Sequence, residues 1–180
     1  MPTCQALEAI LKSCDNNSGG IYGIWINQQD NIASITPTDP SLGAGWEITA
    51  ITLQPLAPLF ENYYIRRNTS SFTEEAAIDL VNGSSFVTQT IALMFHRREA
   101  DKSRAIKILG SGQQYLTAVV LDANGKYWYF PYLQVSAVAE GSGTARADGS
   151  KYAVTLVAEN EYLAYEVDML PLALSAIGIS

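Results

Sequence analysis

Apolar residues along most of this chain recur at every second position, the period of a β-strand with one covered face. In the segment 71–81, for example, Phe72, Ala76 and Ile78 share one parity and polar residues hold the other. The runs end at residues typical of turns, such as Asn-Gly and Asp-Gly pairs. This pattern predicts strands at 20–26, 32–36, 46–53, 60–66, 71–81, 86–95, 135–146, 151–158 and 162–167, and a hairpin within 115–132.

Two segments follow the helical period instead. In 3–14, apolar side chains recur at spacings of three and four, and Thr3 is a plausible N-cap. In 97–109, charged residues fill the first half, apolar residues fill the second half, and glycines follow. Cys4 and Cys14 belong to the first segment, without the spacing of a metal or redox motif, and either a disulfide or free buried thiols fits them.

The strongest local signal is the hairpin within 115–132, which turns at Asn124-Gly125. A type I′ turn needs positive φ at both central residues, and this pair tolerates it. A two-residue loop would place Leu121 opposite Trp128. We expect further hairpins within 71–95 and between 135–146 and 151–158.

This order of elements predicts a mainly β fold. A β-sandwich or a flattened barrel fits it, with one flanking α-helix and a short N-terminal helix. A length of 180 residues suits a single domain, 1–180, with a sizeable core.

Two segments hold more apolar residues than water-facing loops need. The segment 37–59 is interrupted by prolines, so we expect a projecting loop or arm; a plain surface loop is the alternative. The tail 168–180 carries no charged side chain after Asp168. Exposed apolar patches of this kind promote association, so we expect neighbouring copies to cover them. The candidate interface residues are Trp46, Ile48, Ile51, Leu53, Leu56, Leu59, Leu170, Leu172, Leu174 and Ile177.

Composition narrows the function. The formal net charge of −7 opposes tight binding to nucleic-acid phosphates, although a surface past which DNA slides remains compatible with it. Charged residues make up only 16% of the chain, which suits a surface partly covered by other protein. Neither a signal peptide nor an apolar run of about 20 residues is visible. We therefore expect a soluble protein made in the cytoplasm, with no membrane partner.

Candidate chemistry is sparse, and we expect no enzyme, catalytic residue, cofactor or metal site. The single histidine, His96, ends an apolar strand, and the chain has no serine elbow or phosphate-binding glycine motif. Glu74 and Glu75 point to opposite faces of a strand, so they cannot form an acid–base pair. The segment 122–125 contains part of a calcium loop but lacks the other ligands, and a hairpin turn explains it.

Several stretches between 60 and 167 then stand out together. They are Phe60 to Glu75, Val87 to Leu93, the single helix that follows, Asp122 to Trp128, and Gly143 to Gly149. In the order of their predicted elements and in their general residue pattern, these stretches resemble the small tail-tube proteins of tailed phages. The cysteine-containing start and the apolar tail lie outside the resemblance.

The resemblance implies a β-sandwich subunit of the virion tail that forms a hexameric ring. Rings would stack through the segment 37–59, beside other virion proteins, and an inner sheet would line an acidic channel through which DNA passes without tight binding. It implies no catalytic residue. Alternatives are a head decoration, tail terminator or baseplate protein, or a non-enzymatic, sugar-binding β-sandwich that uses Trp25, Trp46 and Trp128.

Overall fold

The computed structural model of the chain describes residues 10, 14–37, 46–79, 81–111, 114–145 and 147–179. The prediction of a mainly β chain is confirmed. The strands are β1 (Ile21–Gln28), β2 (Ile32–Thr36), β3 (Glu47–Ile48), β4 (Ala50–Leu53), β5 (Glu61–Asn62), β6 (Ser71–Asp79), β7 (Ser84–His96), β8 (Leu116–Asp122), β9 (Tyr127–Gly141), β10 (Lys151–Asn160) and β11 (Tyr165–Val167). The helices are α1 (Ala100–Gly110) and α2 (Pro171–Ala176), and a 3-10 turn, Gln29–Asn31, joins β1 to β2. Most of the helix expected at 3–14, and the residue Cys4, lie outside the described residues, whereas Cys14 is exposed and free rather than buried.

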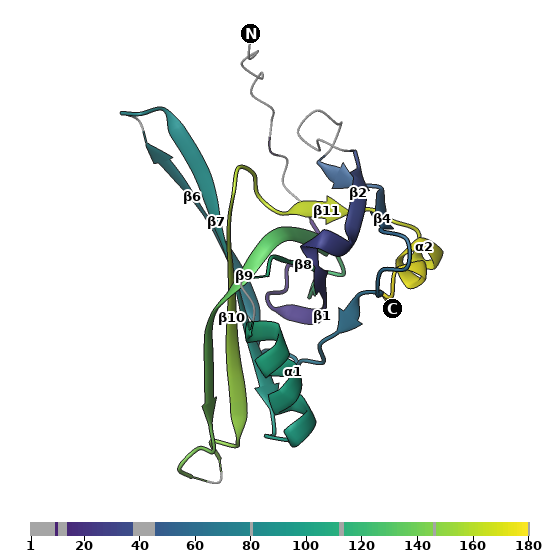
Figure 1. Cartoon of the computed structure of the whole chain (residues 1–180). Coiled ribbons are helices and arrows are strands. Elements are labelled where there is room, and N and C mark those ends of the chain that lie inside the picture. The colour runs from purple at the N-terminus through teal and green to yellow at the C-terminus, as the bar shows by residue number, and fades with distance from the viewer. Residues whose placement is uncertain are drawn as a thin grey trace.

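Nine of these strands form one sheet that is not closed. Its order is β5-β1-β8-β9-β10-β7-β6, and β11 joins β9 to β3 at one side. Strands β2 and β4 pair separately. In Figure 1, β6, β7, β10 and the lower part of β9 form a long upright group, and the remaining strands lie to one side of it.

Strand β9 connects the two parts of the sheet. Its first half pairs with β8 as far as Leu133, and its second half, 134–141, pairs with β10. Between the halves Tyr132 has a φ of 56°, and the register with both neighbouring strands shifts nearby. Such a bulge bends a strand without ending it. The sequence predicted two separate strands here, and that prediction was wrong because the bulge lets one strand serve both parts.

Two apolar cores lie on opposite faces of the β1, β8 and β9 strands. The first core combines side chains from β1 and β8 with side chains from β7 and β10, and α1 covers it with Ile106 and Leu109. The second core contains Trp25, Val119 and Tyr129 from the other face of the same strands. Because both faces are apolar, both need a covering layer.

The segments expected to project supply that second layer. Ile48 and Ile51 of β3 and β4 are buried in the second core, and so are Leu174 and Ile177 of the tail. The tail, expected as an exposed apolar patch covered by a neighbouring copy, forms α2, which begins at Pro171, a residue suited to the first helical position. The expectation of a projecting arm is therefore wrong for residues 46–53, while 38–45 lie outside the described residues.

The β8–β9 turn is wider than predicted. Leu121 lies opposite Tyr127 and Trp128 lies opposite Val120, one position away from the predicted pairing. Among the turn residues positive φ occurs at Gly125. The Asp122 carboxylate accepts hydrogen bonds from the backbone N–H groups of Asn124 and Lys126, at 2.8 and 2.9 Å, and from the Trp128 indole at 2.9 Å. A side-chain cap of this kind stabilises the longer loop.

Candidate assembly interface

Within the described residues, no group of three or more histidine, cysteine, aspartate or glutamate side chains could hold a metal ion. The His96 imidazole has a buried Nε2 with no hydrogen-bond partner. None of the helices in the described segments has the length and apolar character needed to cross a bilayer. The candidate functional surfaces of this fold are its strand edges and exposed faces.

The long group of strands in Figure 1, β6, β7, β10 and residues 134–141 of β9, is called the half-sheet below. Every neighbouring pair in it is antiparallel. Among the described strands, β6 has a partner only on the β7 side, and 134–141 has one only on the β10 side. The half-sheet thus presents two rows of unpaired backbone groups, which can add strands from another chain.

The two faces of the half-sheet differ sharply in chemistry. One face carries Ile91, Leu93, Val154 and Leu156 into the first core. The other face carries mainly small or hydroxyl-bearing side chains with few charges. From β6 inward across the half-sheet, it presents Ser71, Thr73, Glu75, Ala77, Asp79, Ser84, Phe86, Thr88, Thr90, Ala92, Met94, His96, Lys151, Ala153, Thr155, Val157, Glu159, Gln134, Ala137, Ala139 and Gly141. A solvated sheet face usually carries more long charged side chains, so this smooth face is unusual.

A buried polar cluster fixes the upper part of the half-sheet. The Gln89 amide donates to Glu74 Oε1 at 2.8 Å, and its oxygen accepts from Asn160 Nδ2 at 2.6 Å. Glu74 Oε1 also accepts from the backbone N–H of Ala164 at 2.6 Å. These bonds tie the β10–β11 connection to β6 and β7, so the open edge strand is held in a defined position.

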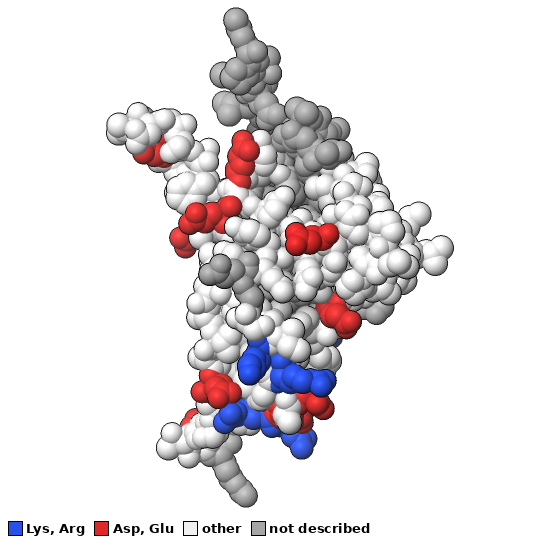
Figure 2. All heavy atoms as spheres, viewed as in Figure 1, with Lys and Arg blue, Asp and Glu red and all other residues white. Residues whose placement is uncertain are grey.

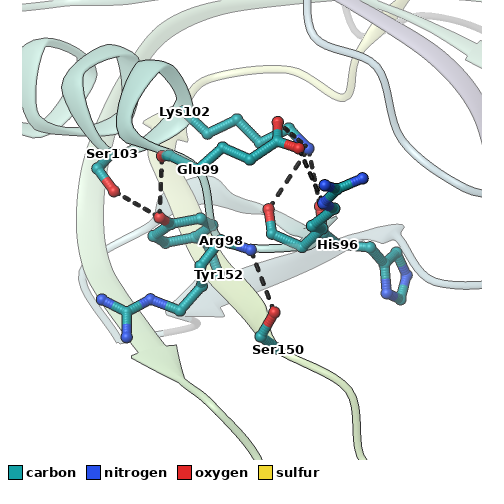
Figure 3. A network of polar contacts seen from close by, with 8 residues as sticks. His96, Arg98, Glu99, Lys102, Ser103, Ser150 and Tyr152 are labelled. Atoms are coloured by element: carbon teal, nitrogen blue, oxygen red, sulfur yellow. Dashed lines mark hydrogen bonds and ion pairs between the residues drawn. The ribbon is translucent and has the colours of Figure 1, made fainter.

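A second polar cluster fixes α1 to the lower end of the half-sheet (Figure 3). Lys102 Nζ donates to the carbonyl of His96 at 2.9 Å and forms an ion pair with Glu99 at 3.2 Å. The Tyr152 hydroxyl lies within hydrogen-bond distance of Ser103, and the backbone N–H of Arg98 donates to Ser150 Oγ at 3.2 Å. The predicted helix at 97–109 thus begins three residues later, at Ala100, because its first residues bind the strand ends.

The ten candidate interface residues divide into two groups. Ile48, Ile51, Leu174 and Ile177 are buried in the second core, and Leu53 packs against it, so these five do not form a free surface. Leu56, Leu170 and Leu172 are 105%, 78% and 84% exposed, and Trp46 and Leu59 are about half exposed. Of the ten candidates, this second group is the one available to a partner, and Trp46 alone of these five lines a groove together with residues of the edge strand β6.

An apolar groove that the sequence did not indicate lies beside the β6–β7 hairpin. It has a volume of about 440 Å³ and is lined in part by Trp46, Ile78, Phe86 and Leu163. Trp46 stacks on Tyr165 with a ring separation of 6.2 Å. The alternation of β6 placed Ile78 on the core side, but this end of the hairpin extends past the core, and hydrophobic periodicity carries no information about where a core ends.

The tryptophans considered for sugar stacking are mostly unavailable. Trp25 is buried in the second core, and Trp128 is half-buried with its indole bonded to Asp122. Trp46 alone of the three exposes a substantial part of its ring, and it stands beside tyrosines rather than polar groups. The three rings therefore share no exposed surface on which a sugar could stack.

No protein-family model and no curated protein matches this sequence.

Proposed function

We propose that this protein is a self-assembling subunit of a phage tail tube, in which copies join side by side into rings and the rings stack around a DNA channel. The resemblance of residues 60–167 to tail-tube proteins supports the proposal. The observation that carries it is the half-sheet with two open edges.

Strand directions favour a ring. Because β6, β7, β10 and β9 alternate in direction, β6 and the second half of β9 run in opposite directions. A rotation about an axis roughly along the strands keeps those directions. The β6 edge of one copy would therefore meet the β9 edge of the next copy as an antiparallel pair, and repeated contacts of this kind close into a ring. Closure removes both open edges, which are otherwise sites of uncontrolled association.

In such a ring the smooth face of the half-sheet lines the channel, because α1 and the first core cover its other face. Small and hydroxyl-bearing side chains leave a wide bore with few groups that grip phosphate. Glu75 and Glu159 both pair with Thr88, so they lie in one row of this face. Their charges repel DNA phosphates and would keep the DNA mobile.

We infer in addition that the subunit is a β-sandwich rather than a flattened barrel. The half-sheet and the β1–β8 part contribute opposite sides of the first core, as two sandwich layers do. A barrel would need the end strands β5 and β6 to pair, and they lie at opposite ends of the strand order.

The proposal is tested by electron microscopy and sedimentation of the purified protein at high concentration. We expect rings and stacked tubes whose abundance rises with concentration. Rings that never stack would favour a terminator, baseplate or head decoration role. A monomer that stays monodisperse at high concentration would contradict the proposal.

The edge contact has a direct test. Ala137 and Ala139 are exposed residues on the open β9 edge, and A137E/A139E places two long, negatively charged side chains there. We expect loss of rings with an unchanged far-UV spectrum and melting temperature, since charged side chains on an edge strand oppose edge-to-edge pairing.

The matched control is A33E/S34E, which adds the same charge on exposed residues of β2, outside the half-sheet. It should form rings normally. Equal ring formation by the two variants would exclude the β6–β9 contact.

A further inference from the structure

The charges of this molecule are separated along the strand direction. In Figure 2, Lys and Arg residues gather at the lower end, around α1, together with some acidic residues, whereas the charged residues visible in the upper part are acidic. Strands β6 and β7 contain no Lys or Arg, and β10 contains none beyond its first residue, Lys151. The acidic residues Glu75 and Asp79 lie in β6, Glu159 lies in β10, and Glu161 follows β10. The upper end of the half-sheet is therefore acidic.

The lower end keeps a surplus of positive charge after its internal ion pairs are formed. Glu99 pairs with Arg97 at 3.1 Å and with Lys102, and Glu140 pairs with Arg98 at 3.1 Å. Asp148 accepts hydrogen bonds from the backbone N–H groups of Ala145 and Thr144, at 2.7 and 2.9 Å, and these bonds together with the charge of Lys151 hold the pKa of Asp148 below its usual value. In the described part of the chain, the exposed residues Arg104, Lys107, Lys151 and Asp101 form no ion pair within 4.0 Å. The cations of this end therefore outnumber its carboxylates, which are Glu99, Asp101, Glu140 and Asp148.

The upper carboxylates are likewise not neutralised by cations. Asp79 accepts from the Asn82 side chain and from the backbone N–H groups of Val81 and Asn82, and these bonds hold the pKa of Asp79 below its usual value. The Glu161 carboxylate accepts a hydrogen bond from the Tyr162 hydroxyl at 3.0 Å. Within the described residues, neither Asp79 nor Glu161 forms an ion pair.

The two ends are too far apart to neutralise each other within one copy. Lys151 and Glu159 begin and nearly end the same strand, β10, and at about 3.4 Å per residue they lie about 27 Å apart. The Debye length at physiological ionic strength is about 8 Å, so water and salt separate the two charges. Each end is left to interact with another molecule.

We propose that the acidic upper end of one copy docks on the basic lower end of a second copy, and that this contact stacks the rings in one direction. The inference rests on the proposed ring, because pairing of the β6 and β9 edges leaves only the strand ends to face the rings above and below. A head-to-tail contact between different surfaces does not close, so it produces an extended tube with all subunits pointing the same way. Like ends repel, which excludes rings stacked in opposite orientations.

The test is a charge swap on exposed residues. The lower variant, R104E/K151E, changes two exposed cations of the lower end that form no ion pair within the described residues. The upper variant, E159K/E161K, changes the end of β10 and the residue after it. Each variant alone has like charges at both ends, so we expect rings of normal size and loss of pelletable tubes.

Two rescues identify the contact. Preformed rings of the two variants, when mixed, should recover tubes, because each carries the end that the other has lost. The four-substitution chain R104E/K151E/E159K/E161K should also form tubes by itself, since both ends are reversed. Wild-type tubes should shorten as ionic strength rises from about 0.1 M to about 1 M, where the Debye length falls from about 10 Å to about 3 Å.

Normal tubes from either two-substitution variant would overturn the inference, and so would a mixture that fails to recover them. Absence of rings in the wild-type protein would instead contradict the proposed function, so the two failures are distinguishable.

Discussion

At the scale of single residues, the side chain that most constrains the half-sheet is the fully buried Gln89. Its amide is bonded at both ends, to Glu74 on one side and to Asn160 on the other. A buried polar group is tolerated when it is satisfied and costly when a partner is lost. Gln89 thus links the open edge strand β6 to β10 and to the connection that follows it.

This residue gives a prediction for stability. In Gln89→Leu, which keeps a similar volume, the Asn160 amide and the Glu74 carboxylate lose a buried partner. We expect the free energy of unfolding to fall by about 1–3 kcal/mol in urea titrations with an unchanged m-value.

The control is Gln134→Leu, since Gln134 is exposed on β9 and a surface change of this kind shifts stability by at most about 0.5 kcal/mol. If Gln89→Leu behaves like Gln134→Leu, the buried cluster does not stabilise the sheet.

At the scale of elements, the tail is the part whose role differs most from the sequence prediction. The Phe60 N–H donates to the carbonyl of Ile177 at 2.9 Å, and Gly178 has a φ of 94°. A Cβ on Gly178 would lie 2.7 Å from the carbonyl oxygen of Phe60 and 2.9 Å from Leu59 Cβ. The tail therefore binds its own chain through a backbone approach that only glycine permits.

Gly178→Ala should detach the end of the tail. The left-handed backbone alone costs about 1–2 kcal/mol with alanine, and the clash with Phe60 adds about 1–3 kcal/mol. Gly149→Ala is the matched control, because Gly149 has a φ of 61° but open space around its Cβ position.

We expect urea unfolding to show the larger loss for Gly178→Ala, with faster protease cleavage near the C-terminus. Equal losses in the two variants would show that the tail does not approach Phe60 in solution.

The elements that the sequence predicted well are those defined by local signals. The strands β2, β6 and β7 and the helix α1 were located to within three residues at each end, since alternation, turn residues and terminal glycines specify them locally. The sequence predicted two strands in place of β9, because a bulge at Tyr132 leaves no simple signal in the pattern of apolar and polar residues. The apolar excess of 46–53 and 168–180 was recognised, but its partner was assigned to another copy. A sequence shows that apolar residues need cover without showing which surface provides it.

At the scale of the whole molecule, backbone edges rather than apolar side chains favour assembly. With Ile48, Ile51, Leu174 and Ile177 buried in its own core, the chain has less apolar surface to hide than its sequence indicated. What stays unsatisfied among the described strands is the hydrogen-bonding capacity of β6 and of residues 134–141. These edges belong to the most regular part of the fold, so they present a rigid and directional surface to a second copy.

A ring built through these edges has a calculable width. Each copy contributes the same four alternating strands, so any number of copies closes without a parallel seam. Six copies, the number that the tail-tube resemblance implies, give a cylinder of about 24 strands; with strands about 4.8 Å apart and tilted by about 40°, its backbone diameter is about 50 Å. One copy more or fewer changes that diameter by about 8 Å on the same geometry.

Cryo-electron microscopy of rings should therefore resolve a continuous inner wall of strands about 50 Å across, with α1 outside it and the row of Glu75 and Glu159 facing the bore. The A137E/A139E variant is the control, since it should give no such wall. An inner wall made of loops or of α1, or one interrupted between copies, would mean that the open edges serve some other contact.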